Sequence, residues 1–239
     1  EERCKLYSIN QIKIPFSKNM DLRIEDFIKK AKSVDMIYLD SPNNPTGFQF
    51  SNKDLEKLIK SFSGPVIIDE AYGEFSNSSV LRLVKKYPNL ILVKTLSKAF
   101  GLAGLRVGYM IADKKFTEIF SNVIQYPYPL NTIAIECGIL ALEKSKQITS
   151  IFENIKKQRT RVIQNLKKYD AFDVFDSNAN FVLFDAKGAD TRVYNALIEQ
   201  GISIRKLGKL ASHKGCLRVT IGTSDMNSKF LLAIRDLLE

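Results

Sequence analysis

Hydrophobic and polar positions follow two different patterns along the first half of the chain. Short and almost continuous apolar runs predict strands over residues 36–39, 65–68, 90–93 and 107–112. Between these runs, apolar residues recur at helical spacing and predict helices over residues 23–30, 51–62, 79–86 and 114–123. Strands of this kind that alternate with helices are typical of a mostly parallel sheet, which binds ligands at the carboxyl ends of its strands.

The pattern changes near Asn131. Two long helical stretches come first, over residues 132–143 and 148–168. Short strands and two more helices follow, over residues 173–175, 180–184, 192–199, 202–205, 216–221 and 226–238. We therefore predict a large α/β domain over residues 1–143 and a smaller α+β domain over residues 144–239.

Composition narrows the class of protein. Hydrophobic residues make up 45% of the chain and charged residues 26%, as in a soluble globular enzyme. The net charge of +10 suggests a nucleic-acid partner, but the lysines are scattered over predicted helix faces without a recognition motif. No apolar run reaches the length of a membrane span, and no signal peptide opens the chain. We expect a cytoplasmic protein that binds neither nucleic acid nor membrane.

Cysteine and histidine content argues against a metal centre. The three cysteines have wide, unpatterned spacing, which indicates neither a disulfide framework nor a zinc site. The single histidine, His213, lies among Ser212, Lys214 and Gly215, a sequence that predicts a solvated polar loop. We expect no bound metal.

The most informative segment covers residues 94–109. Lys98 follows a predicted strand, at a place where a lysine can be desolvated enough to react as a neutral amine with an aldehyde. Thr95, Ser97 and Arg106 offer two hydroxyl groups and a guanidinium, which together suit a phosphate. An aldehyde that carries a phosphate indicates pyridoxal phosphate. Taken alone, however, such a segment is more often a basic surface loop.

Three other segments carry polar side chains at informative places. Two of them follow predicted strands, and the third lies within an apolar strand. Residues 41–47 offer Asn44 in a turn, although alone they could form a plain Pro/Gly loop. Asp69 ends the next strand and Tyr72 follows three residues later, which alone could be a helix cap and a core tyrosine. Arg218 lies among apolar residues, where a cation is costly unless an anion meets it.

In this order and spacing, the four segments resemble the pyridoxal-phosphate-dependent class I and II aminotransferases of fold type I. The nearest branch resembles the histidinol-phosphate aminotransferases. The resemblance rests on Ser-Pro-Asn-Asn-Pro-Thr-Gly, Asp-Glu-Ala-Tyr, Thr-Leu-Ser-Lys-Ala-Phe-Gly-Leu-Ala-Gly-Leu-Arg-Val-Gly-Tyr, and the pairing of residues 201–205 with 216–218. It implies an α/β fold with a seven-stranded-type, mostly parallel sheet domain and a smaller C-terminal domain. It also implies a homodimer that transfers an amino group between histidinol phosphate and 2-oxoglutarate, with glutamate as the amino donor.

The resemblance assigns a catalytic role to three residues. Lys98 is expected to form the Schiff base with the cofactor and to carry the proton. Asp69 is expected to face the pyridine nitrogen and keep it protonated. Tyr72 and Asn44 are expected to hydrogen-bond the ring oxygen, and Asn44 also borders the substrate. The Asn44–Pro45 peptide bond is expected to be cis.

Five further side chains are expected to bind anionic groups of the cofactor or the substrate. The resemblance implies that Thr95, Ser97 and Arg106 hold the cofactor phosphate. Arg205 and Arg218 are expected to meet the anionic end of the substrate. For either arginine, an ion pair with a nearby carboxylate is the alternative.

Two departures from the family pattern leave other functions open. Lys94 stands where many relatives carry arginine. Residues 1–35 match none of the family's N-terminal parts, so we predict that these parts are missing and that the chain could be inactive. The alternatives are an aromatic or aspartate-type aminotransferase, a phosphothreonine-type decarboxylase, or a fragment without catalytic activity.

Overall fold

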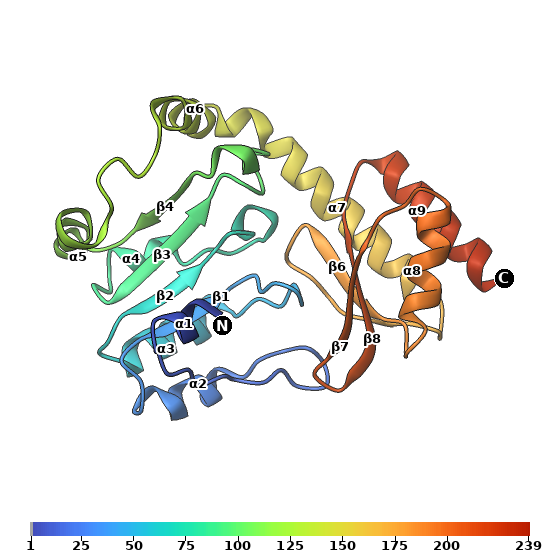
Figure 1. The fold of residues 1–239 in the computed structure, drawn as a ribbon, viewed down its shortest axis with the longest axis horizontal. Coiled ribbons are helices and arrows are strands. Elements are labelled where there is room, and N and C mark those ends of the chain that lie inside the picture. Colours follow the sequence, from blue (N-terminus) through green and yellow to red (C-terminus); the bar gives the residue numbers. More distant parts are fainter. Residues whose placement is uncertain (1) are drawn as a thin grey trace.

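Two separate β-sheets organise the chain (Figure 1), as described by a computed structural model of residues 2–239. The larger domain contains a sheet with the order β1-β2-β3-β4, whose bounds are Ile37–Asp40, Val66–Asp69, Leu90–Thr95 and Gly108–Ile111. Its first three strands are parallel, and β4 runs antiparallel to β3. The second sheet has the order β5-β6-β8-β7 and is antiparallel, with the bounds Asp173–Val174, Phe181–Asp185, His213–Thr220 and Arg205–Leu210.

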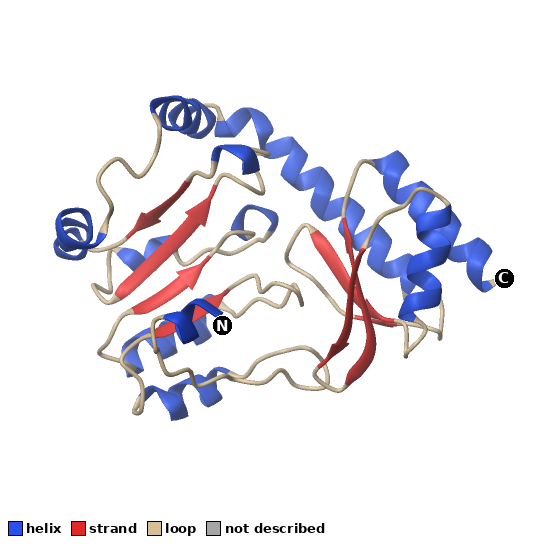
Figure 2. Cartoon of the chain, viewed as in Figure 1, coloured by secondary structure: helices blue, strands red, loops and turns tan. Residues whose placement is uncertain are grey.

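Helices surround the two sheets and connect them (Figure 2). In the first half these are α1 (Glu2–Leu6), α2 (Ile24–Ala31), α3 (Asn52–Ser61), α4 (Leu81–Val84), α5 (Lys114–Ile119) and α6 (Thr132–Glu143). The second half contains α7 (Thr149–Leu166), α8 (Asp190–Glu199) and α9 (Ser224–Leu238). Short 3₁₀ turns cover Gly73–Phe75, Ala103–Leu105 and Ser145–Ile148, and a π-helical turn covers Phe120–Ile124. Within residues 2–239, no helix combines the length and hydropathy that a membrane span requires.

One face of the large sheet forms the first core. Leu39, Ile68 and Leu92 point to this face and pack against α2, α3 and α4. The strand register places Asp40 beside Asp69, and Asp69 beside Val93, at the carboxyl ends of the parallel strands. The polar ends of β1 and β2 therefore share one edge of the sheet, as the sequence predicted.

The second core lies between the small sheet and helices α7, α8 and α9. Val182, Phe184, Leu217 and Val219 form it from the strands. Because side chains alternate along a strand, the neighbouring residues of β6 and β8 lie on the opposite face. Helix α7 runs from the large domain to the small one (Figure 1) and so connects the two cores.

Most predicted elements have the expected type, with ends shifted by a few residues. Ser51 caps α3 by accepting a hydrogen bond from the Asp54 amide. The predicted strand over residues 202–205 is wrong, because β7 begins only at Arg205 and continues to Leu210. The Asn44–Pro45 bond is cis, as predicted, and so is the Ser41–Pro42 bond.

Candidate functional site

The turn after β1 is held by the carboxylate that ends this strand. Asp40 accepts hydrogen bonds from the Asn43 side chain at 2.6 Å and from the Asn44 amide at 2.9 Å. Burial raises the pKa of Asp40 above its ordinary value, although these two hydrogen bonds oppose the shift and the nearby Asp69 adds to it. At the far end of the turn, Gly47 has a φ of +75°. The site thus begins with a turn of fixed shape.

Asp69 at the end of β2 has a partner that sequence reasoning missed. Its Oδ2 accepts a hydrogen bond from the hydroxyl group of Tyr38 at 2.6 Å, and its Oδ1 accepts one from the Ala71 amide at 2.8 Å. Partial desolvation of the phenol, although the residue is 56% exposed, and the hydrogen bond to Asp69 raise the pKa of Tyr38. The phenol is therefore protonated and donates at neutral pH. The only signal in the sequence was the alternation that puts Tyr38 and Asp40 on one face of β1.

Lys98 lies where the sequence predicted, just beyond the end of β3 at Thr95. Its Nζ is 5.5 Å from the centre of the Tyr72 ring. The prediction that Lys98 is desolvated is not met in this structure, because its side chain is exposed. The segment that follows β3 lies at the rim of the sheet, and only the ring of Tyr72 borders the amine among the contacts described for it.

A chain of ring and side-chain contacts leads from Lys98 into the small domain. The Tyr72 ring meets the Phe181 ring edge-on at 5.1 Å, and the Arg218 guanidinium lies 4.7 Å from the centre of the Phe181 ring. Nη1 of Arg218 donates a hydrogen bond to Oδ1 of Asn44. Four of the predicted site residues are therefore brought together, with Phe181 as a fifth member that sequence reasoning missed.

The three residues predicted to hold a phosphate are close in the chain but differ in how many of their hydrogen-bond donors already have partners. The Thr95 hydroxyl lies 3.0 Å from Oγ of Ser97 and 3.1 Å from the Val107 carbonyl. Arg106 is exposed, has a φ of +57°, and donates from Nη1 to the Ala103 carbonyl. Thr95 therefore has partners within the protein, whereas Ser97 and Arg106 retain donors that could meet an anion.

Arg205 and Arg218 lie directly opposite each other on β7 and β8. The salt bridges described within residues 2–239 include neither of them, and Nε of Arg218 is buried without a hydrogen-bond partner. The alternative that a nearby carboxylate forms an ion pair with either arginine is therefore wrong for this structure. A pocket of about 370 Å³ lies beside the pair, lined by Tyr194, Ser203, Ile204, Arg205, Lys206, Arg218 and Thr220.

Behind the site, Lys94 joins two glutamates that sequence reasoning left without a role. Its Nζ is 2.8 Å from Oε1 of Glu74 and 3.3 Å from Oε2 of Glu70. Glu70 is 1% exposed and also accepts hydrogen bonds from the Ser79 hydroxyl and the Val80 amide. The group fixes the loop that follows Asp69.

His213 is not in a solvated loop, so that prediction is wrong. It begins β8 and is 7% exposed, because the turn between β7 and β8 is tighter than the polar sequence suggested. Nδ1 is 2.9 Å from Oδ2 of Asp185, and Nε2 donates to the Lys18 carbonyl at 2.8 Å. The histidine therefore connects the small sheet to the segment before α2.

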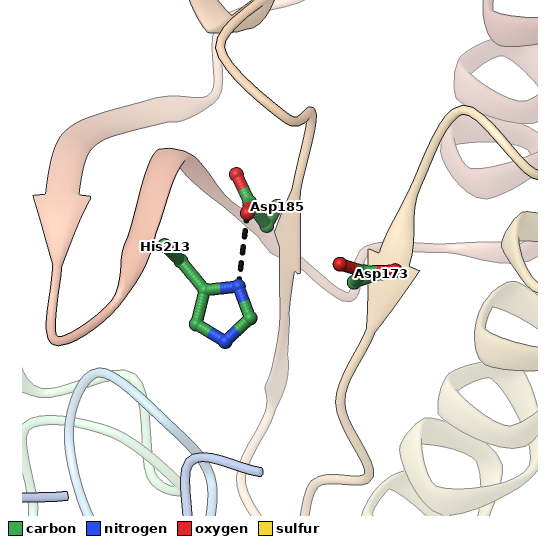
Figure 3. Close-up of side chains that lie close together, drawn as sticks. All are labelled: Asp173, Asp185 and His213. Carbon is green, nitrogen blue, oxygen red and sulfur yellow. Dashed lines mark hydrogen bonds and ion pairs between the residues drawn. The ribbon is translucent and has the colours of Figure 1, made fainter. Parts of the chain in front are cut away.

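The same histidine belongs to a group that resembles a metal site. Asp173, Asp185 and His213 each place one possible ligand atom within 4.8 Å of the others (Figure 3). Both ring nitrogens already have partners, and Oδ1 of Asp185 accepts hydrogen bonds from the amides of Lys187 and Gly215. The hydrogen-bond pattern explains this group without a cation.

Comparison with known proteins assigns these residues to a family. Residues 1–234 match the family "Aminotransferase class I and II". The chain belongs to this aminotransferase family. The family predicted from the ordered motifs is thus confirmed, and the mixed α/β architecture with its largely parallel first sheet agrees with the predicted fold class. The expected seven-stranded sheet is not met, because the sheet described within residues 2–239 has the four strands β1–β4.

Several proteins named histidinol-phosphate aminotransferase are similar to this chain along almost its whole length. The chain is 33% identical over 236 residues to the histidinol-phosphate aminotransferase of Thermoanaerobacter pseudethanolicus, an alignment that covers 98% of this chain and 66% of the relative. It is 37% identical to that of Flavobacterium psychrophilum, over 98% of this chain and 68% of the relative. The crystal structure of the histidinol-phosphate aminotransferase from Clostridium acetobutylicum has a TM-score of 0.90 and 28% identity, covering 99% of this chain and 73% of the other. The chain thus spans about two thirds of the length of the first two relatives.

Proposed function

We propose that this protein is a pyridoxal-phosphate-dependent aminotransferase that acts on histidinol phosphate, with glutamate and 2-oxoglutarate as the other substrate pair. The observation that carries the proposal is the continuous contact from Lys98 through Tyr72 and Phe181 to Arg218 and Asn44. These contacts make an amine, a phenol, a guanidinium and an amide neighbours, which supports a common site for the four groups. The similar proteins that bear the name histidinol-phosphate aminotransferase support the choice of substrate.

The residues around Lys98 fit pyridoxal phosphate by their chemistry. When bound, this cofactor supplies an aldehyde for the amino group and a ring that withdraws electrons. Asp69 has the carboxylate that a protonated ring nitrogen requires, and Tyr38 orients it. Ser97 and Arg106 offer donors for the phosphate, with Thr95 holding Ser97 in place.

Each side chain has one task in this proposal. Lys98 would hold the cofactor through its Nζ, and the same amine would carry the proton once it is released. Because Oδ1 of Asn44 already accepts from Arg218, the amide NH₂ group of Asn44 is left to donate to the ring oxygen, together with the hydroxyl group of Tyr72. Arg218 and Arg205 bind the anionic end of the substrate, and the unpartnered Nε of Arg218 provides a donor for it.

The first prediction is that Lys98 forms the covalent bond with the cofactor. Adding pyridoxal phosphate to the protein is expected to produce a visible absorbance band, which then changes when histidinol phosphate is added. Borohydride reduction and peptide mapping should find the label on Lys98, and a Lys98→Ala variant should show neither band nor label. A label on another lysine, or none at all, would contradict the proposal.

The same spectra separate the alternatives. A band that responds to aromatic or acidic amino acids but not to histidinol phosphate would indicate another aminotransferase. Release of carbon dioxide from a phosphorylated amino acid would indicate a decarboxylase. A band that responds to no amino donor would indicate a fragment that binds the cofactor without turnover.

We also propose that the protein is a homodimer, and that its second copy covers α6. This helix is apolar almost all round, yet only Ala134 and Gly138 are buried. Ile133 is 71% exposed and Leu140 is 50% exposed. An exposed apolar surface of this kind marks an interaction site.

We further propose that the chain divides into two domains at residue 143, a division that the two separate sheets support. We also propose a cytoplasmic location.

The second prediction tests the dimer. Light scattering after size-exclusion chromatography is expected to give the mass of two chains for the parent protein and of one chain for Ile133→Lys. The matched control is Ile151→Lys on α7, where the isoleucine is 53% exposed. This variant should remain a dimer. A monomeric parent, or equal effects of both substitutions, would refute the assignment of α6.

A further inference from the structure

Arg159 is a buried cation at the junction of the two domains. It lies in the connecting helix α7 and is 7% exposed. Its Nη1 donates to the Phe75 carbonyl at 2.9 Å and to the Ala179 carbonyl at 2.7 Å. Phe75 belongs to the loop that follows Asp69 in the large domain, and Ala179 precedes β6 in the small domain. One guanidinium thus ties together two loops that are distant in sequence.

Packing alone gives no reason for a charge at this position. The residues around the two carbonyls form an apolar cluster of Tyr72, Phe75, Phe152, Ala179 and Phe181. The salt bridges described within residues 2–239 give Arg159 no carboxylate partner, and burial lowers the pKa of its guanidinium below the ordinary value. An apolar side chain of similar volume would avoid the cost of burying a charge. What an apolar side chain cannot do is bind both carbonyls and so fix the distance between the loops.

The two loops carry the two halves of the proposed site. The first contains Tyr72, which borders Lys98. The second leads into Phe181, on which Arg218 lies. A shift of one loop against the other would move Arg218 relative to Lys98. It would leave the hydrogen bonds of Asp69 and of the Thr95–Ser97 segment in place, because Arg159 takes part in neither.

A second contact holds the same loop from the other side. The Asn178 amide donates to the Gly47 carbonyl at 2.8 Å. A Cβ atom at Gly47 would lie only 2.2 Å from Oγ of Ser177. The loop before β6 is therefore fixed between the turn that carries Asn44 and the guanidinium of Arg159.

We infer that Arg159 is a positioning residue that holds the Arg218 side of the site in register with the Lys98 side, and so sets the affinity for the substrate rather than for the cofactor. The inference rests on the proposed function. Arg161, two residues further along α7, provides a contrast to Arg159. Its Nη2 donates to Oγ of Ser228, so this hydrogen bond lies within the small domain.

The test, our third prediction, compares Arg159→Met with Arg161→Met in the complete chain. Absorbance titrations give the dissociation constants of pyridoxal phosphate and then of histidinol phosphate. Arg159→Met is expected to weaken histidinol phosphate binding about tenfold or more, since two charge-assisted hydrogen bonds are lost, and to change cofactor binding less than about twofold. Arg161→Met should change neither constant, and Arg159→Lys should restore part of the loss.

Hydrogen exchange adds a measurement that needs no ligand. Peptides that cover residues 72–76 and 177–181 are expected to exchange faster in Arg159→Met than in the parent or in Arg161→Met. Equal losses of both affinities would mean that Arg159 only stabilises the fold, and unchanged exchange in the two loops would overturn the inference. If the parent itself fails to bind pyridoxal phosphate, the proposed function fails, and the exchange result still decides whether Arg159 fixes the loops.

Discussion

Replacing Asp69 with alanine is expected to lower the rate of amino transfer by several orders of magnitude while the protein remains folded. In the proposed site, the Asp69 carboxylate supplies the negative charge that keeps the ring nitrogen of the cofactor protonated, and without it the ring accepts electrons poorly. The fold should survive because the side chain lies at the carboxyl end of β2 and, among residues 2–239, bonds only the Tyr38 hydroxyl and the Ala71 amide.

The measurement is the rate at which histidinol phosphate is consumed in the presence of 2-oxoglutarate, together with a thermal melt. Asp113→Ala is the matched control, since Asp113 also follows a strand of the large sheet and accepts a hydrogen bond from a backbone amide, that of Lys115. The control should retain parental activity. A rate for Asp69→Ala within about tenfold of the parent would remove Asp69 from its proposed role.

Replacing Lys94 with methionine is expected to lower the free energy of unfolding by about 3–5 kcal/mol, because it leaves buried carboxylates without their cation. The side chain of Lys94 is 12% exposed and that of Glu70 only 2%. One oxygen of the second partner, Oε2 of Glu74, already has no hydrogen-bond partner. Nothing else described around the group could neutralise the two charges.

The direction of the pKa shift of Lys94 fixes the pH for this test. Burial opposes its positive charge, but Glu74 and Glu70 outweigh burial and raise the pKa above the ordinary lysine value. The stabilisation is therefore complete at every pH below the ordinary lysine range and is lost only as the pH rises through the folded-state pKa. Neutral pH measures the full effect.

Urea unfolding at neutral pH gives the free energies. Lys85→Met is the control, because Lys85 is exposed at the end of α4, and this change should stay within about 0.5 kcal/mol of the parent. A loss below about 1 kcal/mol at neutral pH would mean that the pair of carboxylates is solvated or rearranges.

The sequence predicted those parts of the site that follow from local order in the chain. Asp69 and Lys98 each come directly after an apolar run, and parallel strands bring such ends to one edge. The strand predicted over residues 202–205 was also inferred from local order alone, and here the local pattern was misleading. Ile202 and Ile204 are apolar at alternate positions, but they pack against the second core before β7 begins.

Contacts between distant residues could not be predicted from one sequence. Tyr38 meets Asp69 only because β1 and β2 pair in one register, and Arg159 reaches Phe75 only because α7 crosses between the domains. His213 was assigned to a loop because its neighbours are polar, whereas its partners, Asp185 and Lys18, come from other elements. Local pattern identifies which residues carry chemistry, and tertiary packing determines what surrounds them.

The close approach of Gly47 and Ser177 has a consequence for how the chain can vary. Any side chain at position 47 would need both a left-handed backbone and space that Ser177 now fills. A larger residue at position 177 would in turn push against the turn that carries Asn44. The two positions belong to different domains, yet their tolerance of substitution is a joint property. Divergence of either domain is thus limited by the other at this point of contact.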